Sequence, residues 1–294
     1  MPQKLYACIL CSSNFLRSVD PSISLCECQD CGLIFRNPRP TFEEIAAYYS
    51  SDAQYDGWLA EERARDAMWR RRLRKIKSHI RSGTLLDVGS GIGQFLTVAQ
   101  TSFVVEGTEI SASALQIAAD KFEIVLHHGS LEEVTETTLR GRRFDIITLF
   151  HVLEHVPYPA LTLATCARII ADGGLLIVAV PNEIGSWRGV LKDLLRSFGI
   201  GRFRSLGKFG LRALDLKELG NEVHLSYFTC SVLETALQRH GFRLRELGLD
   251  PYYAASGMPA AVHLLKYAAC SIVRHVTRIN IYDALWFVAE KNCT

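Results

Sequence analysis

Two acidic residues and three glycines occupy positions from which a chain can bind a charged nucleoside. Residues 85–93 read LLDVGSGIG, an apolar run that passes directly into a turn with glycine at every second position. Glycine lets the backbone turn tightly and lets a ligand approach it closely. Glu109 ends a second apolar run, FVVEGTE, and an acidic group at this point can accept hydrogen bonds from both ribose hydroxyls. The pattern therefore predicts a nucleoside site.

The glycine spacing distinguishes between two ligands that use such a site. A dinucleotide fingerprint requires G-x-G-x-x-G. If Gly89 were its first glycine, the third would have to stand at Gln94, and if Gly91 were the first, the third would have to stand at Leu96. Neither position holds a glycine. The observed order is instead Asp87 followed by Gly89, Gly91 and Gly93 at alternate positions. A dinucleotide site and a turn that serves packing alone remain as the alternatives.

Cysteines are concentrated near the start of the chain. Cys8 and Cys11 form one CxxC pair, and Cys28 and Cys31 form a second pair further along. Two such turns can offer four thiolates to one tetrahedral zinc ion, each about 2.3 Å from the metal. Because so short a segment buries little core, metal binding would supply its folding free energy. A redox pair and a disulfide framework are the alternatives, and Cys26 could replace Cys28 as a ligand.

The composition predicts a soluble, cytoplasmic protein. The chain has 294 residues, of which 48% are hydrophobic, enough for one large α/β domain and a small additional unit. The formal net charge of +2 gives little general attraction for polyanions. We expect no signal peptide, and basic side chains interrupt the apolar stretch from Met258 to Val276, which argues against a transmembrane helix.

From residue 84 onward, patterns typical of strands and helices alternate. This order predicts a doubly wound, mostly parallel sheet with helices on both faces, and ligands bind such sheets at the carboxyl ends of the strands. The expected strands are 84–88, 103–107, 123–127, 144–150, 174–180, 242–249 and 285–289. The expected helices are 93–100, 111–120, 160–170 and 229–240.

We expect three regions: a cysteine unit over 1–40, a helical linker or cap over 41–82, and the sheet domain over 83–294 with insertions at 183–220 and 251–282. The linker should begin with a helix capped by Thr41 and Glu44 and continue in a long helix over 59–81, whose many basic residues we interpret as a solvated face. Its apolar residues at helical spacing should dock it on the sheet domain: Trp69, Leu73, Ile76 and Ile80.

Several of these motifs resemble those of a known family. The segment LLDVGSGIG is similar to the first motif of class I S-adenosylmethionine-dependent methyltransferases, and DIITLFHVLEHV, residues 145–156, resembles the fourth-strand motif of the group that includes the ubiquinone-pathway O-methyltransferases. The run RIIADGGLLI with the following VPN resembles the next helix, turn and strand of that group, and the cysteine unit looks like that of a bacterial subset with a zinc-ribbon-like N-terminus. The resemblance covers about residues 41–250 and implies a Rossmann-like class I methyltransferase fold with S-adenosylmethionine as cofactor.

The resemblance also implies cofactor contacts. Gly89, Gly91 and Gly93 would line the methionine part of the cofactor, and Asp87 would support the turn and the ammonium group. Glu109 would bind the ribose hydroxyls. The adenine and the methionine amine would be contacted by Ile110, Ser130, Leu131 and Phe150.

Methyl transfer to oxygen or nitrogen benefits from a general base, and histidine has a suitable pKa. We expect the base among His151, His155 and His224, with His151 favoured and His155 bonded within its own turn. The ubiquinone-pathway relatives carry two acids and a histidine as metal ligands at the positions of His151, Glu154 and His155. Since His151 departs from that pattern and magnesium prefers oxygen ligands, we expect no catalytic metal.

The expected partner is a small-molecule acceptor such as a sugar or glycan precursor, a quinone-like compound or another secondary metabolite. One hypothesis makes the 183–220 insertion a lid that binds an anionic or lipid-linked acceptor, with peripheral membrane contact; solvated helices are the alternative. RNA methylation and a non-catalytic partner protein are competing functions, but the near-neutral charge argues against nucleic acid. The sequence makes no prediction about subunit number. The basic residues of the insertion are Arg188, Lys192, Arg196, Arg202, Arg204, Lys208, Arg212 and Lys217.

Overall fold

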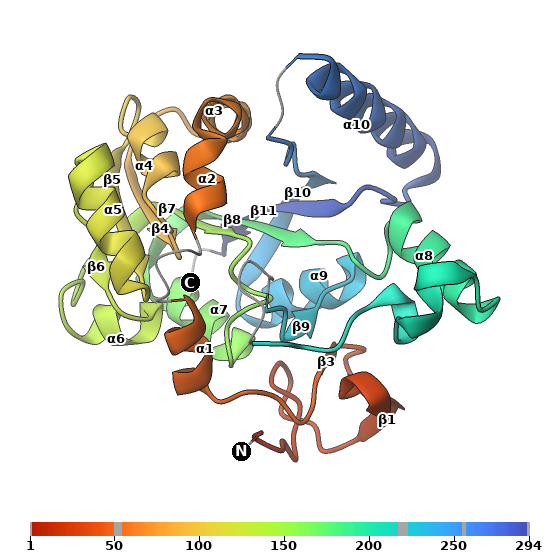
Figure 1. Ribbon diagram of the computed structural model, residues 1–294. Helices are drawn as coiled ribbons and strands as arrows, with labels where there is room; N and C mark the ends of the chain where they lie inside the picture. Colours follow the sequence, from red (N-terminus) through yellow and green to blue (C-terminus); the bar gives the residue numbers. More distant parts are fainter. Residues whose placement is uncertain (1, 50–54, 217–222, 255–256, 293–294) are drawn as a thin grey trace.

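A seven-stranded sheet runs through the centre of the computed structural model, which describes residues 2–49, 55–216, 223–254 and 257–292 (Figure 1). The strand order is β6-β5-β4-β7-β8-β11-β10; the first five run parallel, and β11 is antiparallel to both of its neighbours. The order reverses direction beside β4, so a ligand site is expected where β4, β5 and β7 end. The strands are β4 (Thr84–Val88), β5 (Val104–Glu109), β6 (His127–His128), β7 (Phe144–Phe150), β8 (Ile170–Pro181), β10 (Phe242–Leu249) and β11 (Ala284–Lys291).

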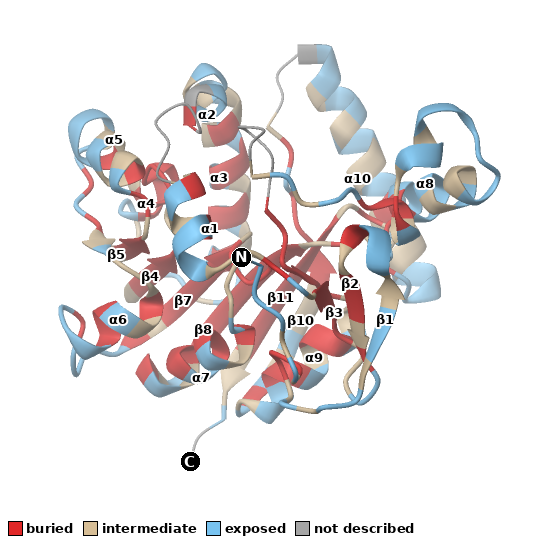
Figure 2. Cartoon of the chain, turned by 60° about the horizontal axis from the view of Figure 1, so that its bottom comes forward, coloured by how far each residue is buried: buried red, intermediate tan, exposed pale blue. Residues whose placement is uncertain are grey.

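Helices cover both faces of this sheet, and its central strands are buried (Figures 1 and 2). Ile146 and Phe150 of β7 pack toward one set of helices, whereas Ile147 and Leu149 pack toward the other, as the two-residue period of a strand requires. The first set is α3 (Glu62–Lys77), α4 (Gln94–Ala99) and α5 (Ala112–Phe122). The second set is α6 (Leu131–Glu136), α7 (Pro159–Ile169) and α9 (Cys230–Arg239).

The N-terminal residues form a second, antiparallel sheet of four strands, of which the last comes from far along the chain. Its strands are β1 (Leu16–Asp20), β2 (Leu25–Cys28), β3 (Ile34–Arg36) and β9 (Ser226–Tyr227). Phe35 and Leu33 are fully buried in the same apolar cluster as the α6, α7 and α9 side of the main sheet. The cysteine unit is therefore packed against the sheet domain.

Most predicted elements are confirmed, including the cap between Thr41 and Glu44, whose backbone and side-chain atoms bond reciprocally at the start of α1 (Phe42–Tyr49). The docking residues of the long helix are also confirmed, because Trp69, Leu73 and Ile76 are buried against the sheet. The predicted helix over 59–81 is wrong in its bounds, because the segment is divided into α2 (Asp56–Ala60) and α3 (Glu62–Lys77).

The predicted strand over 123–127 is wrong. Glu123 has a positive φ of 55° and ends α5, and only His127 and His128 pair with β5. Ile124 and Leu126 are apolar because they pack in the core between the helix and the strand. Helix α6 was missed, since its six residues carry too few apolar positions to show a helical period.

The two insertions contain helices. The first holds α8 (Trp187–Ser197) and the short 3₁₀ helices η3 (Gly201–Ser205) and η4 (Lys208–Gly210), and its Lys217 lies outside the described residues. The second holds α10 (Gly257–Thr277). Within the part of the chain that the structure describes, none of the helices has the length and apolar character needed to cross a membrane.

Gly107 of β5 offers a test of how tightly the sheet packs against α4. A Cβ at this position would collide with Ser90 and would lie 2.6 Å from Leu96 and 2.7 Å from Leu126. We expect Gly107→Ala to lower the free energy of unfolding by about 1–3 kcal/mol, as overpacking does in well-filled cores. Chemical denaturation measures this change. Gly57→Ala is the control, because nothing lies within 4 Å of its Cβ position, and an equal loss in both variants would contradict the packing.

Candidate functional site

A cavity of about 560 Å³ lies at the carboxyl ends of β4, β5 and β7, a size that suits a ligand with a nucleoside part. Helices α1 to α3 contribute the opposite wall with aromatic and basic side chains. The cavity is bordered by eight of the predicted cofactor residues: Asp87, Gly89, Gly91, Glu109, Ile110, Ser130, Leu131 and Phe150.

The backbone of the glycine turn adopts conformations that would strain any residue with a side chain, and other side chains pack closely against it. Gly89 and Gly91 have φ values of +65° and +54°, and a Cβ on either would lie 2.7 Å from a neighbouring side chain, Val152 or Trp58. Gly93 is the residue before α4, and its Cβ position faces Ala118 and Ile124 at 3.3 Å. Gly93 thus lets α4 pack closely and does not border the cavity, and its contact with the cofactor stays a prediction.

Glu109 is held in place by backbone groups of the turn. Its Oε2 accepts a hydrogen bond from the Gly91 amide at 2.8 Å, and its Oε1 accepts from the amides of Ile110 and Ser111 at 2.8 and 2.9 Å. Burial raises the pKa of this carboxyl, while the three amides act in the opposite direction. A carboxylate has about four acceptor positions, so Oε2 retains capacity for a ligand hydroxyl.

Asp87 lies at the end of β4 and is almost fully buried. Its Oδ1 accepts a hydrogen bond from the Thr148 hydroxyl at 2.5 Å. Burial raises the pKa of Asp87 to about 7, because the hydrogen bonds from Thr148 and Ser90 and the charge of Arg72 compensate only in part. A bound cation near this carboxylate would supply the missing compensation.

Ser130 and Phe150 border the cavity, but their side chains are used elsewhere. The Ser130 hydroxyl belongs to a capping box with Glu133 at the start of α6. The Phe150 ring stacks on Trp286, with centroids 5.6 Å apart, and meets Phe95 edge to face. Each of these two residues can therefore offer its main-chain atoms to a ligand, whereas its side chain is already engaged.

Arg72 is a cavity residue that the sequence analysis missed. It is fully buried and forms a double ion pair with Asp250, whose Oδ1 lies 2.9 Å from Nε. Its Nη1 is buried and has no hydrogen-bond partner among the described residues. A ligand carboxylate in this cavity would satisfy that donor. In the sequence, Arg72 is indistinguishable from the exposed arginines around it.

His151 continues the charge network from Arg72 and Asp250. Its Nε2 lies 3.3 Å from Asp250 and its Nδ1 lies 3.4 Å from the fully buried Glu154. Burial lowers the pKa of His151, but the two carboxylates outweigh it and raise the pKa above its usual value. Burial would likewise raise the pKa of Asp250, but Arg72 dominates and lowers it to about 2. Both ring nitrogens of His151 therefore face carboxylates.

The other two histidines form a wall next to this network. The backbone amide of His155 bonds within its own turn, to the Val152 carbonyl at 2.9 Å. Its side chain reaches further, with Nδ1 2.9 Å from both the Val223 carbonyl and the Tyr49 hydroxyl. Its ring centroid is 4.8 Å from that of His224, whose Nδ1 lies 2.8 Å from Glu183. His155 borders the cofactor cavity, whereas His224 borders a different one.

Glu154, His155 and His224 can also be considered as metal ligands, because one ligand atom of each lies within 4.8 Å of the others. Two imidazoles and one carboxylate suit zinc or iron better than magnesium. The expectation of no catalytic metal stays a prediction.

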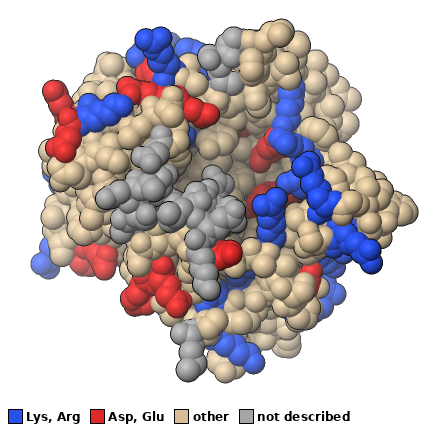
Figure 3. Space-filling model, viewed as in Figure 1, with Lys and Arg blue, Asp and Glu red and all other residues tan. Residues whose placement is uncertain are grey.

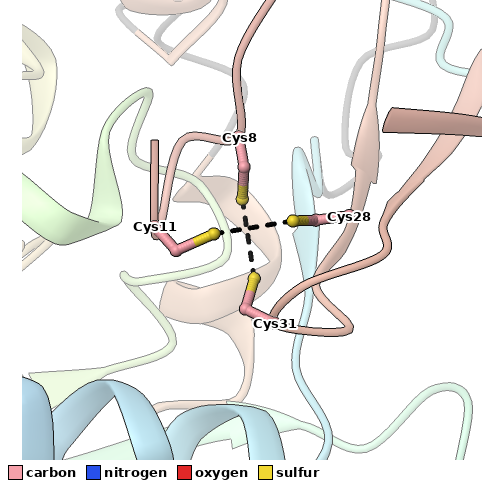
Figure 4. Close-up of side chains that lie close together, drawn as sticks. All are labelled: Cys8, Cys11, Cys28 and Cys31. Carbon is pink, nitrogen blue, oxygen red and sulfur yellow. Dashed lines mark hydrogen bonds between the residues drawn. The ribbon is translucent and has the colours of Figure 1, made fainter. Parts of the chain in front are cut away.

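The four cysteines of the two CxxC pairs converge, with their sulfur atoms pointing toward a common centre (Figure 4). The Cys8 and Cys31 sulfurs are 3.6 Å apart and those of Cys11 and Cys28 are 3.5 Å apart. Four ligands at about 2.3 Å around a tetrahedral zinc ion would be about 3.8 Å apart, so the donor set fits the metal. Cys26 is buried in β2 outside this group.

Comparisons with known proteins agree with this geometry. A family model described as a methyltransferase domain matches residues 59–247. The chain is similar to ubiquinone biosynthesis O-methyltransferases: 36% identical over 118 residues to the mitochondrial protein of Candida albicans, covering 35% of this chain and 34% of that protein, and 36% over 105 residues to the protein of Aromatoleum aromaticum, covering 34% and 44%. The matched part thus spans less than half the length of either relative.

The solved magnesium protoporphyrin IX methyltransferase of Synechocystis PCC 6803, with bound S-adenosylhomocysteine, shares the fold with a TM-score of 0.54, 13% identity and coverage of 86% of this chain and 100% of that one. The strand order and the glycine turn define a class I S-adenosylmethionine-dependent methyltransferase fold. The chain belongs to the methyltransferase-domain family.

The raised pKa of Asp87 predicts a pH dependence of cofactor binding. The carboxyl keeps its proton up to a pH of about 7 in the free protein, whereas only the carboxylate attracts the cofactor's ammonium group. Affinity for S-adenosylmethionine should therefore rise between pH 5 and 7, by up to about tenfold per unit, and level off above. Calorimetry across this range measures the slope. Asp87→Asn should bind weakly without the slope, and an unchanged slope in this variant would assign it to another group.

Proposed function

We propose that this protein transfers the methyl group of S-adenosylmethionine to an oxygen atom of a small molecule. The supporting observation is the cavity at the ends of β4 and β5, where Asp87, Glu109 and the glycine turn meet as the family motif requires. Similarity to ubiquinone biosynthesis O-methyltransferases supports an oxygen acceptor. A quinone-like compound, a sugar or glycan precursor or another secondary metabolite fits this class.

The described residues offer one group each for the ribose, the ammonium group and the carboxylate of the cofactor. Glu109 would hold the ribose through Oε2, Asp87 would attract the ammonium group, and Arg72 would bind the carboxylate through Nη1. Ile110, Leu131 and the backbone at Ser130 would enclose the adenine. When bound, the cofactor supplies a methyl group already activated on a sulfonium, so alignment of the acceptor provides much of the rate.

We assign the proton-accepting role to His224. A neutral His224 that donates from Nδ1 to Glu183 carries its lone pair on Nε2, the arrangement by which a carboxylate orients a catalytic histidine. The acceptor hydroxyl would give its proton to Nε2 while its oxygen forms the new bond to the methyl carbon. His151 is less suited, because Asp250 and Glu154 raise its pKa and so favour the ring that already carries both protons.

We also propose that Cys8, Cys11, Cys28 and Cys31 hold a structural zinc ion. Their sulfur geometry fits a tetrahedral ion, and a closed set of four thiolates leaves no open position for a substrate. The ion would fix the two turns that carry the strands of the N-terminal sheet.

The activity is tested with the purified protein, labelled S-adenosylmethionine and fractions of small molecules, with and without nuclease. We expect nuclease-resistant label in a small-molecule product. His224→Gln should lower kcat about a hundredfold or more at unchanged affinity for S-adenosylhomocysteine. Glu109→Ala should weaken cofactor affinity about tenfold or more. Label that disappears with nuclease would contradict a small-molecule acceptor, and failure to bind either cofactor form would contradict the activity.

The metal site is tested by counting zinc per chain after dialysis. Wild-type protein should retain one zinc ion, and Cys31→Ser should lose it and melt at a lower temperature. Cys26→Ser is the matched control and should keep the metal. Loss of zinc from the control but not from Cys31→Ser would transfer the ligand role to Cys26. A second metal ion that survives Cys31→Ser would contradict the expectation of no catalytic metal.

A further inference from the structure

A second cavity, of about 940 Å³, lies between the first insertion and the N-terminal sheet. Its walls come from α8, η3 and η4, from residues 211–215, and from the β3 and β9 strands. Figure 3 shows basic side chains gathered beside the central hollow, on the side of the molecule where α8 lies in Figure 1. The volume is at the upper end of the range for small-molecule sites.

Basic side chains outnumber acidic ones around this cavity, and the acids are already engaged. Glu183 pairs with His224, and Asp283 pairs with Lys266 and Arg188. A third acid, Asp215, also borders the cavity. The basic side chains that border it are Arg36, Arg188, Lys192, Arg202 and Arg212.

Three of these cations have no acidic partner within the described part of the chain. Across the described residues, Lys192, Arg202 and Arg212 form no ion pair with an acid. Arg36 differs, because its guanidinium donates to the Tyr227 hydroxyl at 2.9 Å and to backbone carbonyls. Three unpaired cations around one concave surface create a positive potential that attracts a multiply charged anion.

Apolar and aromatic groups line the same space. Phe203, Phe209 and Tyr227 contribute rings, and Leu206 and Leu211 contribute aliphatic surface. Such a lining suits a ligand that combines an anionic group with a ring or carbon skeleton, because each part meets a matching surface.

The second cavity lies next to the cofactor cavity, with the rings of His155 and His224 between them. His224 borders the second cavity and His155 borders the first, with 4.8 Å between their ring centroids. Val223 also borders the second cavity, and its carbonyl contacts His155 at 2.9 Å. A molecule bound beside α8 can thus place a hydroxyl next to the proposed proton acceptor.

The N-terminal sheet holds the basic side of the cavity in place. Arg36 of β3 donates to the Arg212 carbonyl at 2.5 Å, and the Lys208 amide donates to Asp20 at 2.8 Å. Gly207 packs so closely on Ile23 that a Cβ there would lie 2.5 Å from it. The insertion is therefore attached to the cysteine unit at three points.

We propose that the second cavity binds the acceptor of the methyl transfer, and that this acceptor is a phosphate-bearing small molecule with a ring. Lys192, Arg202 and Arg212 hold the phosphate, and the aromatic lining holds the ring with a hydroxyl directed at His224. The proposal rests on the proposed function, whose cofactor would lie in the adjoining cavity. Phosphate is favoured over carboxylate because three unpaired cations balance more than one negative charge.

The test measures binding of phenyl phosphate to the full-length protein, saturated with S-adenosylhomocysteine, by calorimetry at low salt. Inorganic phosphate tests the anion alone, and benzyl alcohol tests the ring alone. We expect phenyl phosphate to bind more tightly than either, and Arg202→Ser to weaken it about tenfold or more. Arg204→Ser is the matched control, because Arg204 lies in the same turn but does not border the cavity, and it should bind as the wild type does.

The outcomes separate the two proposals. If phenyl phosphate does not bind, binds no better than benzyl alcohol, or is unaffected by Arg202→Ser and by Arg212→Ser, the anion site is overturned even where the cofactor still binds. If inorganic phosphate binds equally well, the ring part of the proposal is overturned. If the cofactor product does not bind while phenyl phosphate does, the proposed methyl transfer is overturned and the anion site stands.

Discussion

A chain of buried and partly buried polar groups connects the two cavities, and the arrangement around both depends on it. Along Arg72, Asp250, His151 and Glu154, each side chain lies within ion-pair distance of the next. The series continues through His155, His224 and Glu183. Burying a single charge is costly, so each member requires its neighbours. The network fixes α3, the end of β7, the segment after β10 and the end of β8 relative to one another.

The need to pair every buried charge also gives the residues of this series different roles. Arg72 uses two nitrogens on Asp250, and its buried Nη1 has no hydrogen-bond partner among the described residues, whereas His151 is occupied on both sides. Glu183 at the other end orients His224, which borders the second cavity. A cofactor on one side and an acceptor on the other would thus be aligned by one rigid polar series, and alignment is the main requirement of methyl transfer.

Much of the fold and the cofactor cavity could be predicted because the signals are local. The turn at Gly89 and Gly91 follows a buried strand, and the spacing of the four cysteines reflects two tight turns. The contacts of Asp250, Glu183 and Arg36 could not be predicted, because their partners lie far away in the chain: Asp250 meets Arg72, and Arg36 meets Tyr227. Helix α6 was not predicted because it is short. The packing role of Gly93 was not predicted, because a packing glycine and a ligand-facing glycine have the same sequence pattern.

The pairing of β3 with β9 has a consequence for how the chain is assembled. Ile34 and Phe35 pair with Tyr227 and Ser226, which leave the ribosome long after them, so the N-terminal sheet cannot close its last edge during early synthesis. An open strand edge invites pairing with other chains. The sheet would be complete only once most of the seven-stranded sheet has been made, which joins the folding of the first forty residues to that of the rest.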